Sequence, residues 1–324
     1  MLRILVLLLW IPAAWASLYD VRVAVPAEQD GNTVQIQQQA LNTVLSRLTG
    51  RAALSDGRLL KFTDNAGQWI ASWGFASELD EASRIATLSV SPSIRRELAT
   101  LEIPLWTQPR PAQWLWMLVD LGEGRQPISR QSAPELWSAL QQQADFWQLP
   151  LATPQWNDQD QAEVNTSELW GLFLDGVDRA AQRYSSDYTA GRILKAGDQW
   201  QMSIKTSDGR RLTTRYPSAQ ALAQGLYEFW RTPLVSRYAI AGQGQLDLAI
   251  EQLTSQGYAN WIRVIRDLDG VDRVWPIFSN DQFTVLRIQT GATADQLNAL
   301  LSTTLNFEPS ALPASADLMV RWLP

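Results

Sequence analysis

The sequence predicts an α+β protein made of three small α/β units with mixed sheets, the last of which is ferredoxin-like. Stretches in which apolar and polar residues alternate, as in half-buried strands, are interleaved with stretches in which apolar residues recur at helical spacing. Glycine, asparagine and proline residues mark turns between these stretches. With 324 residues and a hydrophobic fraction of 46%, the chain is long and apolar enough for two or three cores.

Residues 1–16 predict a secretory signal peptide. They combine one basic residue, Arg3, with an apolar run over residues 4–11 and a small-x-small cleavage site at Ala14-Trp15-Ala16. The run is too short to span a bilayer, and the chain has no cysteine for a lipid anchor. We therefore expect a soluble protein exported to a bacterial periplasm, with no transmembrane span after signal cleavage.

Residues 17–103 predict an N-terminal α/β unit. A strand over residues 19–25 alternates apolar with polar or small residues and stops at Pro26. An amphipathic helix follows and ends at Gly50; its apolar face carries Ile36, Ala40, Leu41, Val44, Leu45 and Leu48. The remaining elements are strands at residues 68–75 and 85–90 and a helix at residues 93–100.

Residues 104–240 predict a middle domain in the order strand, helix, strand, helix, three strands, helix. Its first strand, residues 114–119, is continuously apolar, which is typical of a strand buried on both faces. The second helix begins at Ser167, and its predicted inner face carries Trp170, Phe173, Leu174, Val177, Ala181 and Tyr184. Asp208-Gly209 is a strong hairpin signal between the last two strands. The other elements are expected at residues 132–147, 149–152, 187–194, 200–206, 211–216 and 218–230.

Residues 241–324 predict a C-terminal ferredoxin-like domain. The glycine-rich stretch 241–245 is typical of a linker. After it, strands and helices follow in the order β-α-β-β-α-β, which is the split βαβ pattern. The elements are expected at residues 246–250, 255–268, 271–278, 282–289, 293–303 and 317–323.

Composition limits the chemistry that the protein can perform. The formal net charge of -6 disfavours binding to the phosphate backbone of nucleic acids. The chain has no histidine and no cysteine, so it lacks the residues of Ser-His-Asp and Cys-His catalysis and of most zinc sites. Nucleophile-elbow and phosphate-loop motifs are also missing from the sequence. We therefore predict a protein that is not an enzyme and holds no metal or other cofactor.

An acidic stretch in the middle domain is one candidate binding site. Asp158, Asp160 and Glu163 lie in the predicted polar loop 156–165. Carboxylates on a loop suit a hard cation or acid-base hydrolysis. The calcium-loop pattern is incomplete, however, and a solvated loop is the simpler interpretation.

A basic hairpin is a second candidate. Arg210 and Arg211, with Arg215, follow the Asp208-Gly209 turn. They suit an anionic envelope partner, such as a lipid headgroup or an acidic protein. The alternative is that these charges protect an exposed strand from edge pairing.

Tryptophan is abundant, with 16 in the chain. Trp116, and the tryptophans on predicted helix faces, are expected in the cores. Trp106 lies in a proline-stiffened connector, residues 103–111, and Trp156 lies in the polar loop. Trp69, Trp73 and Trp275 also lie near loops or strand ends, where an indole can stack on a sugar ring or insert into a partner. Trp106 and Trp156 are the tryptophans that we select as candidate binding residues.

Five segments of the sequence, in the order in which they occur, resemble those of a known protein family. They are VRVAVP, ALNTVLSRLTG, IPLWTQPRPAQWLWMLVD, ELWGLFLDGVDRAAQRYSSDYTAGRI and LDLAIEQLTSQGYANWIRVIRDLDGVDRV. Together they resemble the proteobacterial exported proteins of the domain of unknown function 2066 family, over almost all of the mature chain. The resemblance implies export and no catalytic residues. The element order of the middle unit is also similar to that of the N-terminal domain of the periplasmic Tol propeller protein, which is a topological analogy.

These observations predict a non-catalytic periplasmic protein that binds other envelope proteins and assists the assembly or maintenance of a surface complex. One alternative is a glycan- or peptidoglycan-binding module that uses surface tryptophans. Another is a carboxylate-dependent hydrolase built on Asp158, Asp160 and Glu163.

Overall fold

The chain forms an α+β protein, as the sequence predicts. The computed structural model describes residues 18–26, 33–52, 56–76, 83–242, 244–268, 270–310 and 316–323, and the predicted signal at residues 1–16 lies outside them. Two compact units are present, Met1–Val44 with Lys61–Pro92 and Leu45–Leu60 with Ser93–Pro324. The described strands form three sheets, one in the first unit and two in the second.

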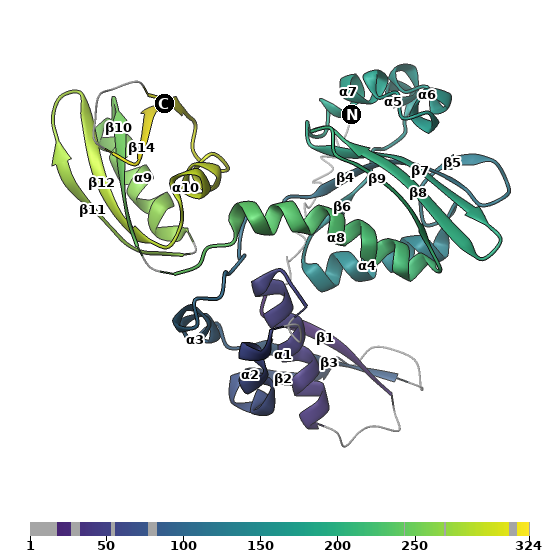
Figure 1. Ribbon diagram of the computed structural model, residues 1–324, viewed down its shortest axis with the longest axis horizontal. Coiled ribbons are helices and arrows are strands. Elements are labelled where there is room, and N and C mark those ends of the chain that lie inside the picture. Colours follow the sequence, from purple (N-terminus) through teal and green to yellow (C-terminus); the bar gives the residue numbers. More distant parts are fainter. Residues whose placement is uncertain are drawn as a thin grey trace, which may run out of the picture. The chain divides into compact units, whose positions relative to one another are not determined.

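The first unit contains an antiparallel sheet in the order β1-β3-β2. Strand β1 spans Asp20–Pro26, β2 spans Ile70–Ala76 and β3 spans Ser83–Val90. Val21 and Val23 of β1 lie opposite Leu88 and Ala86 of β3, and all four are buried. Helix α1, Thr33–Thr49, begins in this unit (Figure 1), and its apolar residues from Ile36 to Leu48 are buried as predicted.

Short helical segments before β2 were not predicted. They are η3 (Gly57–Leu59), α2 (Leu60–Asp64) and η4 (Ala66–Trp69). The predicted strand start at residue 68 is wrong by two residues, because Ala66–Trp69 close a 3-10 turn first. In the second unit, helix α3 spans Ile94–Thr100, within the predicted range.

The second sheet has the order β5-β4-β7-β8-β9, with β6 paired to β4. Strands β4 and β7 run parallel, whereas β7, β8 and β9 form an antiparallel meander. Helices α4 and α8 cover one face, and α5, α6 and α7 lie on the other (Figure 1). The strands are β4 (Gln113–Asp120), β5 (Arg125–Pro127), β6 (Leu151–Ala152), β7 (Tyr188–Ala196), β8 (Gln199–Thr206) and β9 (Arg211–Tyr216). The helices are α4 (Pro134–Trp147), α5 (Asp158–Glu163), α6 (Thr166–Trp170), α7 (Asp175–Ala181) and α8 (Ala219–Tyr238).

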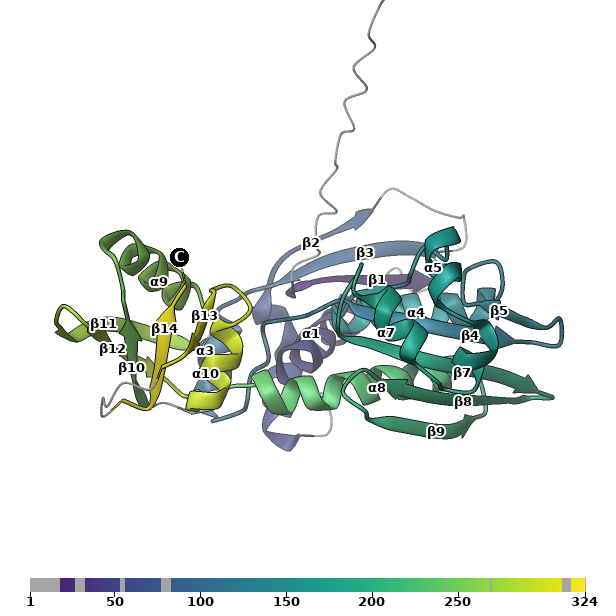
Figure 2. The ribbon, with the colours of Figure 1, turned by 90° about the horizontal axis from the view of Figure 1, so that it is seen from above.

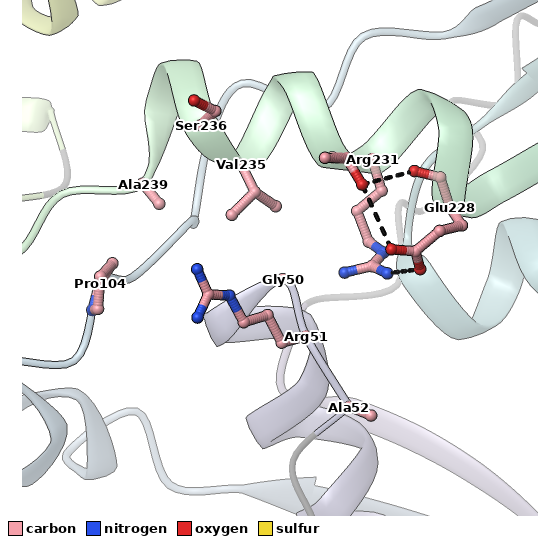
Figure 3. A pocket seen from close by; sticks show the side chains of 10 residues that line it. Gly50, Arg51, Ala52, Pro104, Glu228, Arg231, Val235, Ser236 and Ala239 are labelled. Atoms are coloured by element: carbon pink, nitrogen blue, oxygen red, sulfur yellow. Dashed lines mark hydrogen bonds and ion pairs between the residues drawn. The ribbon is translucent and has the colours of Figure 1, made fainter. Parts of the chain in front are cut away.

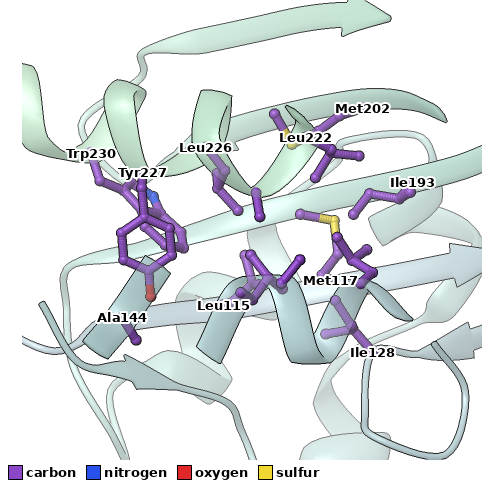
Figure 4. Packing of buried hydrophobic residues seen from close by; sticks show 14 of the residues in the cluster. Leu115, Met117, Ile128, Ala144, Ile193, Met202, Leu222, Leu226, Tyr227 and Trp230 are labelled. Atoms are coloured by element: carbon purple, nitrogen blue, oxygen red, sulfur yellow. The ribbon is translucent and has the colours of Figure 1, made fainter. Parts of the chain in front are cut away.

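Strand β4 is buried on both faces, which explains its continuous apolar run. Leu115 and Met117 pack with Ile193 and with Leu222 of α8 (Figure 4). Trp116 points to the opposite face and is fully buried, as predicted for a core residue. The strand therefore separates two small cores within one domain.

The predicted helix over residues 167–184 is interrupted. Helix α6 ends at Trp170, Leu172 adopts a positive φ of 64°, and α7 begins at Asp175. The break turns Phe173 outward, and its 70% exposure shows that its predicted place on the inner face is wrong. The preceding loop also contains a short helix, α5, because the side chain of Asn157 accepts a hydrogen bond from the backbone N–H of Asp160 at 3.1 Å.

The third sheet has the order β11-β12-β10-β14-β13. Strands β10 and β14 are parallel neighbours, and the other pairs are antiparallel. Helices α9 and α10 run beside this sheet (Figure 2), and its inner face buries Leu248, Ile250, Leu286, Ile288 and Val320. The elements are β10 (Gln245–Glu251), α9 (Ser255–Asp267), β11 (Val271–Ser279), β12 (Phe283–Thr290), α10 (Ala294–Leu301), β13 (Phe307–Pro309) and β14 (Leu318–Trp322). Strand β13 is an addition to the predicted series.

No helix in the described part of the chain combines the length and the apolar composition that crossing a bilayer requires.

Candidate functional site

Trp106 is a core residue, and its interpretation as a ligand-facing residue is wrong. Its side chain is 0% exposed. The indole N–H donates to the carbonyl of Pro109 at 3.1 Å, and the guanidinium of Arg110 lies over the ring at 3.9 Å. An indole that is fully buried, with its N–H bonded and a guanidinium on its ring, cannot stack on a sugar.

Two arginines near Trp106 were not predicted: Arg47, which is buried, and Arg110, which is partly buried. Arg110 donates to the carbonyls of Arg47 at 2.7 Å and Trp106 at 2.8 Å, and also to that of Trp147. Arg47 donates to the carbonyl of Phe146 at 2.7 Å. These carbonyls belong largely to the last turns of α1 and α4, where the helix dipole is negative and attracts a cation. Burial, with a smaller effect of Arg47, lowers the pKa of Arg110 to about 9, so the group is charged at neutral pH. This part of the connector is therefore a structural joint.

Asp160 is buried in the middle domain and ion-paired. Its side chain is 0% exposed and accepts hydrogen bonds from Arg183 at 2.9 Å and from the Tyr184 hydroxyl at 2.8 Å. Burial raises the pKa of Tyr184, and its hydrogen bond to Asp160 adds to that rise. Trp156 is half-buried next to this pair, with its ring 5.4 Å from that of Trp116. Of the predicted site residues, the structure thus brings together Trp156 and Asp160.

The other carboxylates of the acidic stretch do not share this environment. Asp158 is exposed on α5, and Glu163 pairs with Arg179 at 2.7 Å. A hydrolytic carboxylate pair must flank one bond of the substrate, with both groups facing it. The described residues also contain no group of three carboxylates or other ligating side chains that would suit a metal ion. The Asp160 set therefore resembles a structural ion pair.

The two predicted arginines of the hairpin point to different faces of the second sheet. Arg210 precedes β9, pairs with Asp208 at 2.8 Å and lies over the ring of Phe229 on α8. Arg211 is the first residue of β9 and is exposed on the opposite face, because side chains alternate along a strand. Arg210 is therefore committed to a structural contact, whereas Arg211 remains available.

Arg211 belongs to a set of cations on the face of the second sheet opposite α4 and α8, the face on which α5, α6 and α7 lie. Register pairs Arg211 with Lys205, and it places Arg215 and Arg192 on the same face. Arg125 of β5 joins them at the far edge of the sheet, opposite Asp120 of β4. We call Arg125, Arg192, Lys205, Arg211 and Arg215 the basic face. None of the five forms an ion pair within the described ranges.

Trp170 is the aromatic component of the basic face. The guanidinium carbons of Arg125 and Arg192 lie 4.6 Å and 5.8 Å from its ring, and Arg192 also donates to its carbonyl. The ring is partly buried and fixes the two guanidinium groups beside it. The sequence pointed only to the hairpin arginines; the contributions of Arg125 and Arg192 depend on strand order.

In the first unit, the edge strand β2 exposes two aromatic residues. Trp73 and Phe75 are 48% and 43% exposed, and their rings are 5.6 Å apart in an edge-on arrangement. Each lies opposite a buried residue of β3, Leu88 and Ala86 respectively, so both extend the apolar face of the sheet.

One family model matches part of the chain. It is described as a domain of unknown function (DUF8605) and covers residues 13–107. This is not the domain of unknown function 2066 family, so the family named from the sequence is wrong, although an uncharacterised domain family is indeed found. The match includes the described residues of the first unit and ends just after Trp106 in the connector. No curated protein and no solved structure matches the chain.

Proposed function

We propose that the protein is a non-catalytic binding protein of the bacterial cell envelope whose basic face holds an acidic segment of another envelope protein. The observation that carries this proposal is the concentration of five cations, none of them ion-paired among the described residues, on one sheet face of a protein with a net charge of -6. The predicted export signal supports the envelope as the location. Binding of this kind would serve the assembly or maintenance of a surface complex.

The spacing of the basic face suits an extended acidic segment. Arg211 and Arg215 are four residues apart on β9, which places their Cα atoms about 13 Å apart. Lys205 and Arg192 lie on the next two strands, each about 5 Å further across the sheet. The planar guanidinium groups hold carboxylates through two parallel hydrogen bonds. Several such contacts at an exposed surface favour rapid, salt-sensitive association.

Charge reversal tests this proposal. We expect the double variant Arg211→Glu with Arg215→Glu to recover its crosslinked envelope partners about tenfold less efficiently than the unmodified protein. The matched control is Arg130→Glu with Arg266→Glu, which changes the net charge equally at two exposed arginines away from the basic face. Equal loss in both double variants, or no specific partner with the unmodified protein, would refute the basic face as the binding site. Vesicles with anionic headgroups form a separate arm, and recovery on these vesicles in place of a protein would also overturn the proposal.

Glycan binding is a second candidate, and the exposed pair Trp73 and Phe75 favours it. Two neighbouring aromatic faces can stack on successive sugar rings. Co-sedimentation with peptidoglycan should then be lost in Trp73→Ala, whereas Trp156→Ala should retain it. Equal sedimentation of Trp73→Ala and the unmodified protein would eliminate this candidate.

A further inference from the structure

A cavity of about 610 Å³ lies between the end of α1 and the second half of α8, within the second unit (Figure 3). Arg51, Glu228 and Arg231 form its charged wall, and Pro104, Val235 and Ala239 form its apolar wall. This volume is in the range of small-molecule sites, and a few fixed polar groups against an apolar wall are typical of them.

Arg231 is a buried cation with incomplete pairing. Its side chain is 8% exposed, and its carboxylate partner is Glu228, which is 62% exposed. The Nε atom of Arg231 has no hydrogen-bond partner, and the guanidinium stacks on the ring of Trp147 at 4.2 Å. Removal of a cation from water is costly unless counter-charges and hydrogen bonds replace the water. One exposed carboxylate does this only in part.

Arg51 supplies a second positive charge to the same cavity. In Figure 3 its guanidinium lies on the same side of α8 as that of Arg231. Burial lowers the pKa of Arg231, Glu228 opposes this, and the charge of Arg51 lowers it further. Two guanidinium groups and one carboxylate leave an excess of one positive charge at the cavity.

The backbone holds Arg51 in this place. Gly50, with a φ of 64°, allows α1 to end in close contact with α8, since a Cβ at this position would lie 2.2 Å from a methyl carbon of Val235. The N–H of Trp106 donates to the carbonyl of Leu48 at 2.6 Å, which joins the last turn of α1 to the connector. The cavity is thus built on the same joint that buries Trp106 and Arg110.

We propose that this cavity binds a small organic anion, whose carboxylate or phosphate group lies between the guanidinium groups of Arg51 and Arg231 and whose apolar part contacts Pro104, Val235 and Ala239. The ligand supplies a second counter-charge to Arg231 and neutralises the excess charge. Its apolar part distinguishes it from inorganic phosphate. The cavity shares no residue with the basic face, and its ligand is a small molecule instead of a protein segment.

Calorimetric titration of the full chain at low ionic strength tests the proposal. The probes are phenyl phosphate, phenylacetate and inorganic phosphate. We expect at least one of the two aromatic anions to bind with a dissociation constant between about 10 μM and 1 mM, and inorganic phosphate to bind about tenfold more weakly than phenyl phosphate. Arg51→Gln should weaken binding of the aromatic anion about tenfold, since one charge-assisted contact is lost.

Arg130→Gln is the matched control, because it removes an exposed arginine of the same domain that does not line the cavity. Arg231→Met is a second test variant, in which the methionine keeps an apolar contact with Trp147. The absence of binding by both aromatic anions up to about 10 mM would overturn the proposal. Binding that stays unchanged in both Arg51→Gln and Arg231→Met would overturn it as well.

Discussion

Replacement of Trp106 by alanine should destabilise the second unit severely. The side chain is 0% exposed, and truncation of a buried tryptophan costs about 3 to 5 kcal/mol of unfolding free energy. The variant also loses the 3.1 Å hydrogen bond to Pro109, worth about 1 kcal/mol, and leaves Arg110 without the ring on which it stacks at 3.9 Å. Because these effects overlap, we expect a total loss of about 4 to 6 kcal/mol, which approaches the whole stability of an ordinary domain.

Urea unfolding followed by far-ultraviolet circular dichroism measures this loss without relying on tryptophan fluorescence. Trp106→Phe should be intermediate, since it keeps a ring under Arg110 and removes the N–H donor. Phe173→Ala is the control in the same unit: its side chain is 70% exposed, and its removal should change stability by less than about 0.5 kcal/mol. If Trp106→Ala lost less than about 1 kcal/mol, the assignment of this tryptophan to the core would be refuted.

Two further predictions concern buried ionisable groups. Asp160→Asn should lower the unfolding free energy by about 2 to 3 kcal/mol, because it removes the charge that pairs with Arg183 while retaining the side-chain size; urea unfolding that detects less than about 0.5 kcal/mol would contradict the buried pair. Burial raises the pKa of Tyr227, and burial followed by the hydrogen bond to Asp178 raises that of Tyr188. The unfolded chain therefore loses these protons first, and stability that is fully present below about pH 10 should decline as the pH rises further. Unfolding curves between about pH 9 and pH 11 should show this decline, and Tyr227→Phe should make it shallower; equal stability at both ends would contradict the prediction.

Periodic segments of the sequence predicted the second sheet well. The expected strands at residues 187–194, 200–206 and 211–216 lie within or close to β7, β8 and β9. The alternation of apolar and polar residues and the Asp208-Gly209 turn are local signals. The hairpin can therefore be predicted without knowledge of distant contacts. The expected helix at residues 167–184 failed for a local reason as well, because its apolar spacing continues through the break at Leu172.

The burial of Trp106 was not predictable, since its environment is built by residues far away in the sequence. The last turn of α1 contributes Arg47 and Leu48, and α4 contributes the carbonyl of Trp147. A tryptophan among prolines has the same local sequence whether it faces a ligand or a core. Only the meeting of α1, α4 and the connector distinguishes the two.

The basic face was predictable in part. The composition of the hairpin pointed to Arg210 and Arg211, but the side on which each lies follows from strand register. Arg125 joins the set because β5 and β7 both border β4, a neighbour relation that the sequence does not state. A local cluster of basic residues in the sequence therefore indicates where a basic face lies. It does not identify which residues belong to that face.

The third sheet offers a comparison with the basic face, because it also carries cations on a face without helices. Its helix-free face carries Arg287, which pairs with Asp247 at 2.8 Å, and Arg321, which pairs with Glu251 at 3.0 Å. The hydrogen bond from Arg287 lowers the pKa of Asp247. Arg273 of β11 lies on the same face, opposite Gln289, and forms no ion pair among the described residues. Protection of a strand from edge pairing needs charge, but it does not require that the charges stay unpaired. The basic face differs in number, because five cations without an ion pair among the described residues lie together there, whereas on the third sheet Arg287 and Arg321 are paired and Arg273 is not. That contrast within one chain favours an external acidic partner over edge protection.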